Sequence, residues 1–306
     1  MVYHGPMRRS VRFTFHISVP ASDAATLVWV PRPVEDDWQS VLGEALPDGV
    51  SIERGRDPET GTTMLHFAVP RSATPTAFDV GFMVERRERV HARPAPAHYP
   101  RSPVADAQLA TFLRSDRRVR ADGSNLERAR EIASLDEPPI VIARKIFDHL
   151  LETLTYDSAG CTPDRAHGLG DLEAACDLRS GTCTEFHGLF VAFARALGVP
   201  ARFNFGFNIP RGKSAGRIGG YHCWAEICLP DGTWFPVDVS EAWKRRELAD
   251  FYFGSLDPDR IAFTYGRDVV LVPPQRAPRI DRFIFPYAEA GEVEVDPTLT
   301  FSFAEL

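Results

Sequence analysis

The segment 182–198 specifies both ends of a helix by local chemistry. Thr182 is followed three residues later by Glu185, the spacing of a capping box, in which each side chain accepts a hydrogen bond from the other residue's backbone. Apolar side chains then recur at helical spacing: Phe186, Leu189, Phe190, Phe193 and Leu197. Gly198 supplies the C-terminal stop. The pattern predicts a helix with one core-facing stripe that begins at Cys183.

A helix start is a chemical environment that favours a thiolate. The first backbone N–H groups of a helix have no partner within it, and the positive end of the helix dipole lies there, so an anion is stabilised. Nucleophilic catalysis by cysteine also needs an imidazole that shares the proton and a group that orients this imidazole. Cys183 is therefore a candidate nucleophile that requires two further residues.

Two predicted strands downstream carry candidates for these partners. The strands cover residues 221–229 and 233–239 and are joined by Pro230, Asp231 and Gly232. This connection suits a three-residue hairpin loop with glycine in the left-handed position. The resulting register pairs Trp224 with Asp238, which puts Asp238 on the face of His222 and diagonal to it. The turn thus predicts a contact between His222 and Asp238. The spacing of residues along the chain does not predict whether Cys183 lies near this hairpin.

Each candidate also has a structural interpretation. Cys183 suits an inert core thiol, His222 a packed histidine among aromatic residues, and Asp238 a cap at a strand end. His187, one turn after the cysteine, is interpreted as structural because intrahelical geometry makes a linear Cys–His pair awkward. The backbone N–H of Cys183 is a candidate oxyanion donor, and Tyr156 is either a second donor or a packing residue.

The 306 residues suffice for two domains. The first hundred are predicted to form a small antiparallel sandwich, with strands over 11–19, 25–30, 63–69 and 77–86. The proline-rich stretch 93–103 is a linker or an extended crossover. We therefore expect a β-rich N-terminal domain over 1–100 and a second domain, with a C-terminal extension, over 101–306.

The second domain alternates helical and strand patterns, as expected for an α+β fold. Helices are predicted over 104–114, 125–135, 139–156 and 171–178, with Asn125 as an N-cap, and a further strand over 201–209. The Gly-, Arg- and Ser-rich segment 210–220 is predicted to be a mobile loop beside any site.

Composition excludes several classes of protein. Basic residues number 35 against 42 acidic ones, a net charge of −7, which argues against nucleic-acid binding. No stretch approaches the roughly 18 apolar residues of a membrane span, so no membrane partner is expected. The start of the chain alternates like a strand and not like a signal peptide. We expect a soluble cytoplasmic protein, although a leader preceding this sequence would change that expectation.

The five cysteines form neither a disulfide framework nor a zinc motif, because their number is odd and C-x-x-C and H-E-x-x-H are absent. The four residues Cys161, His167, Cys176 and Cys183 are too irregularly spaced for a metal set. We therefore expect no metal and no cofactor.

Four motifs in order resemble the transglutaminase-like superfamily. They are Gly-x-Cys at 181–183, Ala-Arg-Ala-Leu-Gly-Val-Pro-Ala-Arg at 194–202, His-x-Trp-Ala-Glu at 222–226 and Trp-x-Pro-Val-Asp at 234–238. The resemblance covers about residues 138–240 and implies a papain-like α+β core, with the cysteine helix packed on an antiparallel sheet. By position it implies Cys183 as nucleophile, His222 as base and Asp238 as orienting acid. The β-rich start, including 27–33, resembles the N-terminal domain of bacterial members. No Asp-rich calcium loop is visible.

The resemblance implies acyl transfer or hydrolysis at amide bonds of a protein or peptide substrate, through a thioester. One alternative is another acyltransferase with the same triad, similar to the arylamine N-acetyltransferases, whose Arg-Gly-Gly lead-in is absent before Cys183. Another is a non-catalytic interaction module with the same fold. The sequence predicts neither the acyl acceptor nor the oligomeric state.

Overall fold

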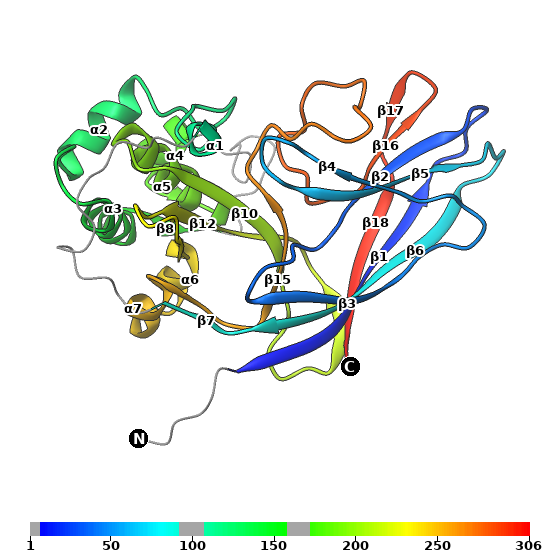
Figure 1. Cartoon of the computed structure of the whole chain (residues 1–306), viewed down its shortest axis with the longest axis horizontal. Helices are drawn as coiled ribbons and strands as arrows, with labels where there is room; N and C mark the ends of the chain where they lie inside the picture. The colour runs from blue at the N-terminus through cyan, green and yellow to red at the C-terminus, as the bar shows by residue number, and fades with distance from the viewer. Residues whose placement is uncertain (1–6, 92–106, 158–171) are drawn as a thin grey trace. The chain divides into compact units, whose positions relative to one another are not determined.

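The computed structural model describes residues 7–91, 107–157 and 172–306, which divide into two compact units (Figure 1). The strand-rich unit comprises Met1–Arg89, Phe205–His222 and Asp257–Leu306. The helical unit comprises Val90–Asn204 and Cys223–Leu256. The predicted domain boundary between residues 100 and 101 lies outside the described residues. The strand-rich unit is discontinuous in sequence, because it also takes strands from the middle and the end of the chain.

Two antiparallel five-stranded sheets form the strand-rich unit within the described ranges, with strand orders β11-β18-β1-β6-β3 and β17-β16-β2-β5-β4. Their strands are β1 (Arg8–Val19), β2 (Thr26–Pro31), β3 (Gln39–Ala45), β4 (Glu53–Arg56), β5 (Thr63–Val69), β6 (Thr76–Arg87), β11 (Ala215–Ile218), β16 (Tyr287–Ala290), β17 (Val293–Val295) and β18 (Thr298–Glu305). The predicted strands correspond to β1, β2, β5 and β6, so the expectation of a β-rich start is confirmed.

The segment 210–220 corrects one prediction, because it contains strand β11 and is not simply a loop. β11 pairs antiparallel with β18, with Gly216 opposite Phe303. Of its residues only Ile218 is buried. An edge strand gains its hydrogen bonds from its neighbour and can lack apolar alternation, so the sequence pattern does not reveal it.

Aromatic side chains from distant parts of the sequence form the core between strands of this unit. β1 contributes Phe13 and Phe15, and β18 contributes Phe301. The Phe13 ring lies 4.7 Å from that of Phe207 and 5.1 Å from that of Phe263, measured between centroids. Edge-to-face and tilted pairs of this kind stabilise beyond their buried area. The first and last strands, blue and red in Figure 1, are thereby packed together as well as hydrogen-bonded.

Helices dominate the helical unit. They are α1 (Ala107–Ala110), α2 (Ser124–Ile132), α3 (Pro139–Thr153), α4 (Leu172–Leu178), α5 (Cys183–Ala196), α6 (Val239–Lys244) and α7 (Ala249–Tyr252), with a 3-10 turn at Arg246–Leu248. The strands β8 (Thr155–Tyr156), β9 (Ser180–Gly181) and β13 (Trp234–Val237) lie in this unit. The strands β10 (Ala201–Asn208) and β12 (His222–Cys228) contribute residues 201–204 and 223–228 to it, and β13, β12 and β10 are neighbours in one sheet. Among the described residues, no helix has the length and apolar character to span a membrane.

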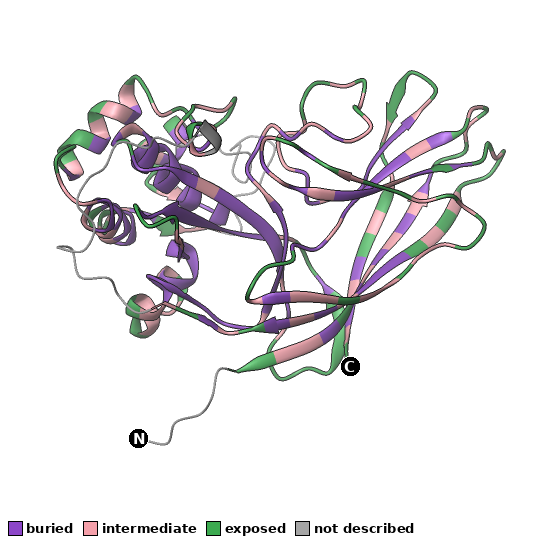
Figure 2. Ribbon diagram, viewed as in Figure 1, coloured by how far each residue is buried: buried purple, intermediate pink, exposed green. Residues whose placement is uncertain are grey.

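Helix α5 is the centre of the helical unit. Every residue from Cys183 to Arg195 is buried, as the purple ribbon in Figure 2 shows. The sequence predicted one core-facing stripe, and this is wrong in extent because α2, α3, α4 and α6 all contact α5. Asn125 is also not an N-cap. It lies inside α2, where its amide donates to the Arg120 carbonyl at 2.9 Å, and Gly123 takes the cap position.

Replacing Phe13 by alanine should lower the free energy of unfolding by about 3–5 kcal/mol, because it removes a fully buried ring from the aromatic core. Arg12→Ala on the same strand is the matched control, since Arg12 is exposed and should cost less than about 0.5 kcal/mol. Guanidinium unfolding monitored by circular dichroism measures both. Equal costs for the two variants would contradict the assigned core.

Candidate active site

The predicted capping box is present at the start of α5. The Thr182 backbone N–H donates to Glu185 Oε2 at 2.8 Å, and the Thr184 N–H donates to the Thr182 hydroxyl at 3.3 Å. Cys183 is therefore the first residue of the helix, as predicted, and it is 6% exposed. A buried thiol at this position lies in the field of the helix N-terminus.

Gly181 makes room for the capping glutamate. A Cβ atom at this position would lie 2.5 Å from the Glu185 Cβ. In the parallel pair of β8 and β9, Gly181 lies opposite Tyr156, and its carbonyl accepts from the Asp157 N–H at 3.0 Å. The glycine two residues before Cys183 is thus explained by close packing and not by a positive φ angle.

The other end of α5 also follows the prediction. Gly198 has φ +75°, the left-handed conformation that glycine adopts without strain. Its N–H donates to the Arg195 carbonyl at 2.9 Å, and the Val199 N–H donates to the Ala194 carbonyl at 2.8 Å. This pair of bonds is the Schellman motif, which satisfies carbonyls at the helix end.

The hairpin of β12 and β13 has the predicted register. Ala225 lies opposite Val237, and the Leu229 N–H donates to the Thr233 carbonyl at 2.8 Å. Gly232 has φ +86°, as the three-residue loop requires. Continuing this register by one pair from Ala225 and Val237 puts Trp224 opposite Asp238. His222 is the first residue of β12, shares the strand face of Trp224 and is 3% exposed.

Asp238 is fully buried and caps helix α6. Its Oδ1 accepts from the Glu241 N–H at 2.9 Å and from the Ser240 hydroxyl at 3.1 Å. The capping interpretation of this aspartate is therefore confirmed. It does not exclude a second role, since a carboxylate can accept several hydrogen bonds on its two oxygens.

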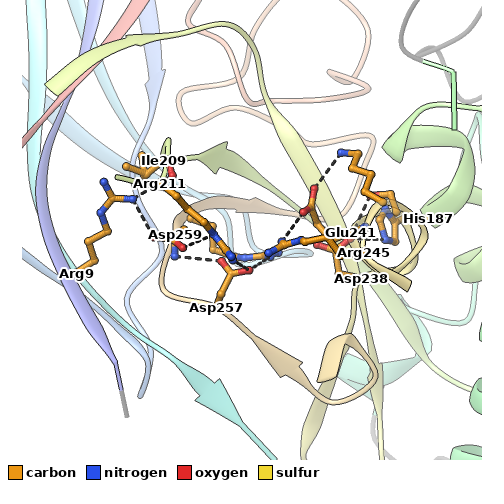
Figure 3. Close-up of polar contacts among 12 residues, drawn as sticks. Arg9, His187, Ile209, Arg211, Asp238, Glu241, Arg245, Asp257 and Asp259 are labelled. Atoms are coloured by element: carbon orange, nitrogen blue, oxygen red, sulfur yellow. Dashed lines mark hydrogen bonds and ion pairs between the residues drawn. The ribbon is translucent and has the colours of Figure 1, made fainter. Parts of the chain in front are cut away.

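His187 joins the start of α5 to the turn that follows Asp238. Figure 3 shows its side chain beside Asp238. Its Nε2 accepts from the Val239 backbone N–H at 3.0 Å, so this nitrogen carries no proton. Its Nδ1 then donates to the Cys183 carbonyl at 2.8 Å. The ring is neutral and fully buried, and the 3.5 Å separation of its Nε2 from Asp238 Oδ1 is not a hydrogen bond. This geometry supports the structural interpretation of His187.

A second thiol, that of Cys223, lies against the same helix start. Its Sγ is 3.8 Å from Nδ1 of His187. Burial raises the pKa of Cys223 well above its ordinary value, and the hydrogen bond to Cys183 and the charges of Cys183 and Asp238 raise it further. Sequence reasoning missed Cys223, because alternation along the strand assigned it to the face opposite His222. Its position next to His222 was the available signal.

No metal site accompanies this cluster in the described part of the chain, where no three metal-ligating side chains come together. Of the four residues considered for a metal, Cys161 and His167 lie outside the described residues. Cys176 is a partly buried free thiol on α4, and burial raises its pKa.

Comparison with known proteins finds a family similarity in this part of the chain. A family model described as the transglutaminase-like superfamily matches residues 127–239, the stretch that contains α5, β12 and β13. Residues 127–239 are therefore similar to the transglutaminase-like superfamily. The fold is α+β with a papain- and transglutaminase-like core preceded by a β-rich region, as predicted.

The similarity to known proteins extends beyond residues 127–239. A Haemophilus influenzae protein of uncharacterised function is 26% identical over 320 aligned residues, which cover 91% of this chain and 84% of that protein. A Cytophaga hutchinsonii crystal structure, described provisionally as a cysteine protease, shares the fold with a TM-score of 0.65 and 16% identity, over 99% of this chain and 93% of that one. The periplasmic domain of TgpA from Pseudomonas aeruginosa has a TM-score of 0.39 and 15% sequence identity, over 76% of this chain and 96% of that one.

Gly181→Ala should destabilise the protein by about 1–3 kcal/mol, because the added methyl group displaces Glu185 from the capping box. Gly220→Ala is the matched control, since a Cβ there has no neighbour within 4 Å. Denaturant unfolding measures the difference. Equal stability of the two variants would show that Glu185 can move aside without lowering the free energy of unfolding.

His187→Leu should lower the free energy of unfolding by about 2 kcal/mol or more, because it leaves the buried Val239 N–H without its hydrogen-bond acceptor. His149→Leu, an exposed histidine of α3, should change it by less than about 0.5 kcal/mol. Thermal and denaturant unfolding measure both. An unchanged His187→Leu variant would contradict the assigned hydrogen bonds.

Proposed function

We propose that this chain is a cysteine enzyme that transfers or hydrolyses acyl groups at amide bonds of a peptide or protein. Cys183 is the nucleophile, His222 the base and Asp238 the acid that orients it. The observation that carries the proposal is the position of Cys183: it is a buried thiol on the first residue of a capped helix. The neighbouring Cys223 thiol feels the charges of both Cys183 and Asp238, which raise its pKa after burial. The superfamily match over 127–239 supports the same assignment.

The proposed reaction passes through a thioester. The Cys183 thiolate attacks the amide carbonyl, and the backbone N–H of Cys183 donates to the developing oxyanion. The protonated imidazole of His222 gives its proton to the leaving amine. Water or a second amine then attacks the thioester, with neutral His222 accepting a proton from it. Asp238 selects the tautomer and orientation of His222, as the third member of such triads does.

The acyl acceptor decides between hydrolysis and amine transfer. Access of water and the shape of the acceptor site control this choice, and both are properties of the bound complex. The Cytophaga hutchinsonii protein with the same fold is described as a cysteine protease, so peptide hydrolysis is the first activity to assay.

Alkylation by iodoacetamide tests the nucleophile. Cys183 should label at neutral pH faster than a free cysteine, because the helix N-terminus and His222 favour its thiolate. His222→Ala and Asp238→Ala should slow labelling, whereas His149→Ala should not. Tryptic mass spectrometry identifies the labelled cysteine. Labelling no faster than that of a free thiol would contradict an activated nucleophile, and unchanged labelling in both triad variants would contradict the triad.

A peptide library incubated with and without an added primary amine identifies the reaction. Mass spectrometry distinguishes cleavage, deamidation and amine incorporation by their different mass changes. Cys183→Ser is the control and should remove every product. Products that persist in this variant would contradict the role of Cys183.

A further inference from the structure

Tyr156 lies beside the first turn of α5. It is opposite Gly181 in the pair of β8 and β9, two residues before the candidate nucleophile. Its ring centroid is 6.0 Å from that of Phe186, which follows Cys183 by one turn. The ring is therefore held next to the helix start by backbone pairing on one side and by an aromatic contact on the other.

Lys244, one of three lysines in the chain, reaches the same ring from the last residue of α6. Its Nζ is 4.2 Å from the Tyr156 ring centroid and 2.9 Å from Glu241 Oε1. Its charge acts on the Tyr156 phenol and favours the ionised form. Burial works against its charge, but Glu241 and Tyr156 outweigh burial and raise the pKa of Lys244. Lys244 therefore stays protonated and polarises the phenol.

The Tyr156 hydroxyl is a permanent donor. Burial, and after it the charge of Cys183, raise the pKa of Tyr156 to about 12, although Lys244 acts in the opposite direction. Near neutral pH the phenol therefore carries its proton. A group that keeps its proton and lies in the field of the Cys183 sulfur can donate to a negative charge without losing the proton to it.

A purely structural role does not account for this arrangement. The Trp243 ring, with its centroid 6.2 Å from that of Tyr156, and the Phe186 ring would pack against a phenylalanine equally well. What the hydroxyl adds is an O–H group on which the charges of both Lys244 and Cys183 act. An oxyanion formed by attack of Cys183 needs a second donor besides the Cys183 N–H.

We propose that the Tyr156 hydroxyl is the second oxyanion donor of the Cys183 site, with Lys244 as the residue that positions and polarises it. The inference rests on the proposed function, since it assumes that Cys183 is acylated. When the carbon–sulfur bond forms, the carbonyl π electrons move to oxygen, which accepts hydrogen bonds from the Cys183 N–H and the Tyr156 O–H. No proton is transferred to that oxygen. When the carbonyl re-forms, the bond to the leaving group breaks, and an amine leaving group takes its proton from His222.

Two reagents separate this role from thiolate activation. Acylation of Cys183 by p-nitrophenyl acetate forms a tetrahedral oxyanion, whereas alkylation by iodoacetamide displaces iodide at a saturated carbon and forms none. Tyr156→Phe keeps the ring and removes the donor. It should slow acylation by about 100-fold and leave alkylation within about twofold of the unsubstituted protein.

Two further variants complete the experiment. Lys244→Met should slow acylation by about 10-fold, because the phenol remains but is no longer polarised. Tyr265→Phe, at the end of strand β15 (Arg260–Tyr265) in the strand-rich unit, is the control and should change neither rate. Circular dichroism and thermal unfolding check that each variant is folded.

The outcomes distinguish the two proposals. Selective loss of acylation in Tyr156→Phe supports the oxyanion role. Unchanged acylation, or an equal loss of acylation and alkylation, overturns it, because the hydroxyl then only packs or only stabilises the thiolate. If Cys183 of the unsubstituted protein is neither acylated nor labelled faster than a free thiol, the proposed function itself fails.

Discussion

A single buried imidazole connects the helix that begins at Cys183 to the turn that carries Asp238. His187 donates to the Cys183 carbonyl and accepts from the Val239 N–H, so its tautomer is set by two backbone groups. Without the imidazole the buried Val239 N–H would lose its acceptor, which makes the connection costly to break. His187 therefore links the candidate nucleophile Cys183 to the segment that follows the candidate acid Asp238. A histidine one turn after a candidate nucleophile invites interpretation as its base, and the two backbone partners of His187 argue against that role.

Helix α6 links the acid to the proposed oxyanion donor. Asp238 caps its start through the Glu241 N–H, and Lys244 ends it. Glu241 Oε1 in turn holds Lys244, whose ammonium lies over the Tyr156 ring. A six-residue helix is too short to be stable alone, so its capping aspartate and its packing against α5 must hold it. Helix α6 therefore contributes to the candidate site at both of its ends, with Asp238 at the start and Lys244 at the end.

Prediction from the sequence succeeded where a few neighbouring residues decide the structure. The capping box of Thr182 and Glu185 and the glycine loop at Gly232 gave the start of α5 and the register of the hairpin. It was incomplete where the deciding contacts are distant. β11 pairs with a strand more than eighty residues away, and its own composition does not predict a strand. The discontinuous strand-rich unit has the same cause, since its final strand lies beside its first.

The sequence by itself determined that Cys183 begins a helix and that Trp224 lies opposite Asp238, because hydrogen bonds within a few residues fix both. Only the tertiary structure decided which groups surround the thiol. Cys223 comes from a strand and Tyr156 from an extended pair far from it in the chain. Lys244, which lies over the Tyr156 ring, comes from a helix end. Contacts of this kind follow from how the elements pack, and no periodicity or spacing records them.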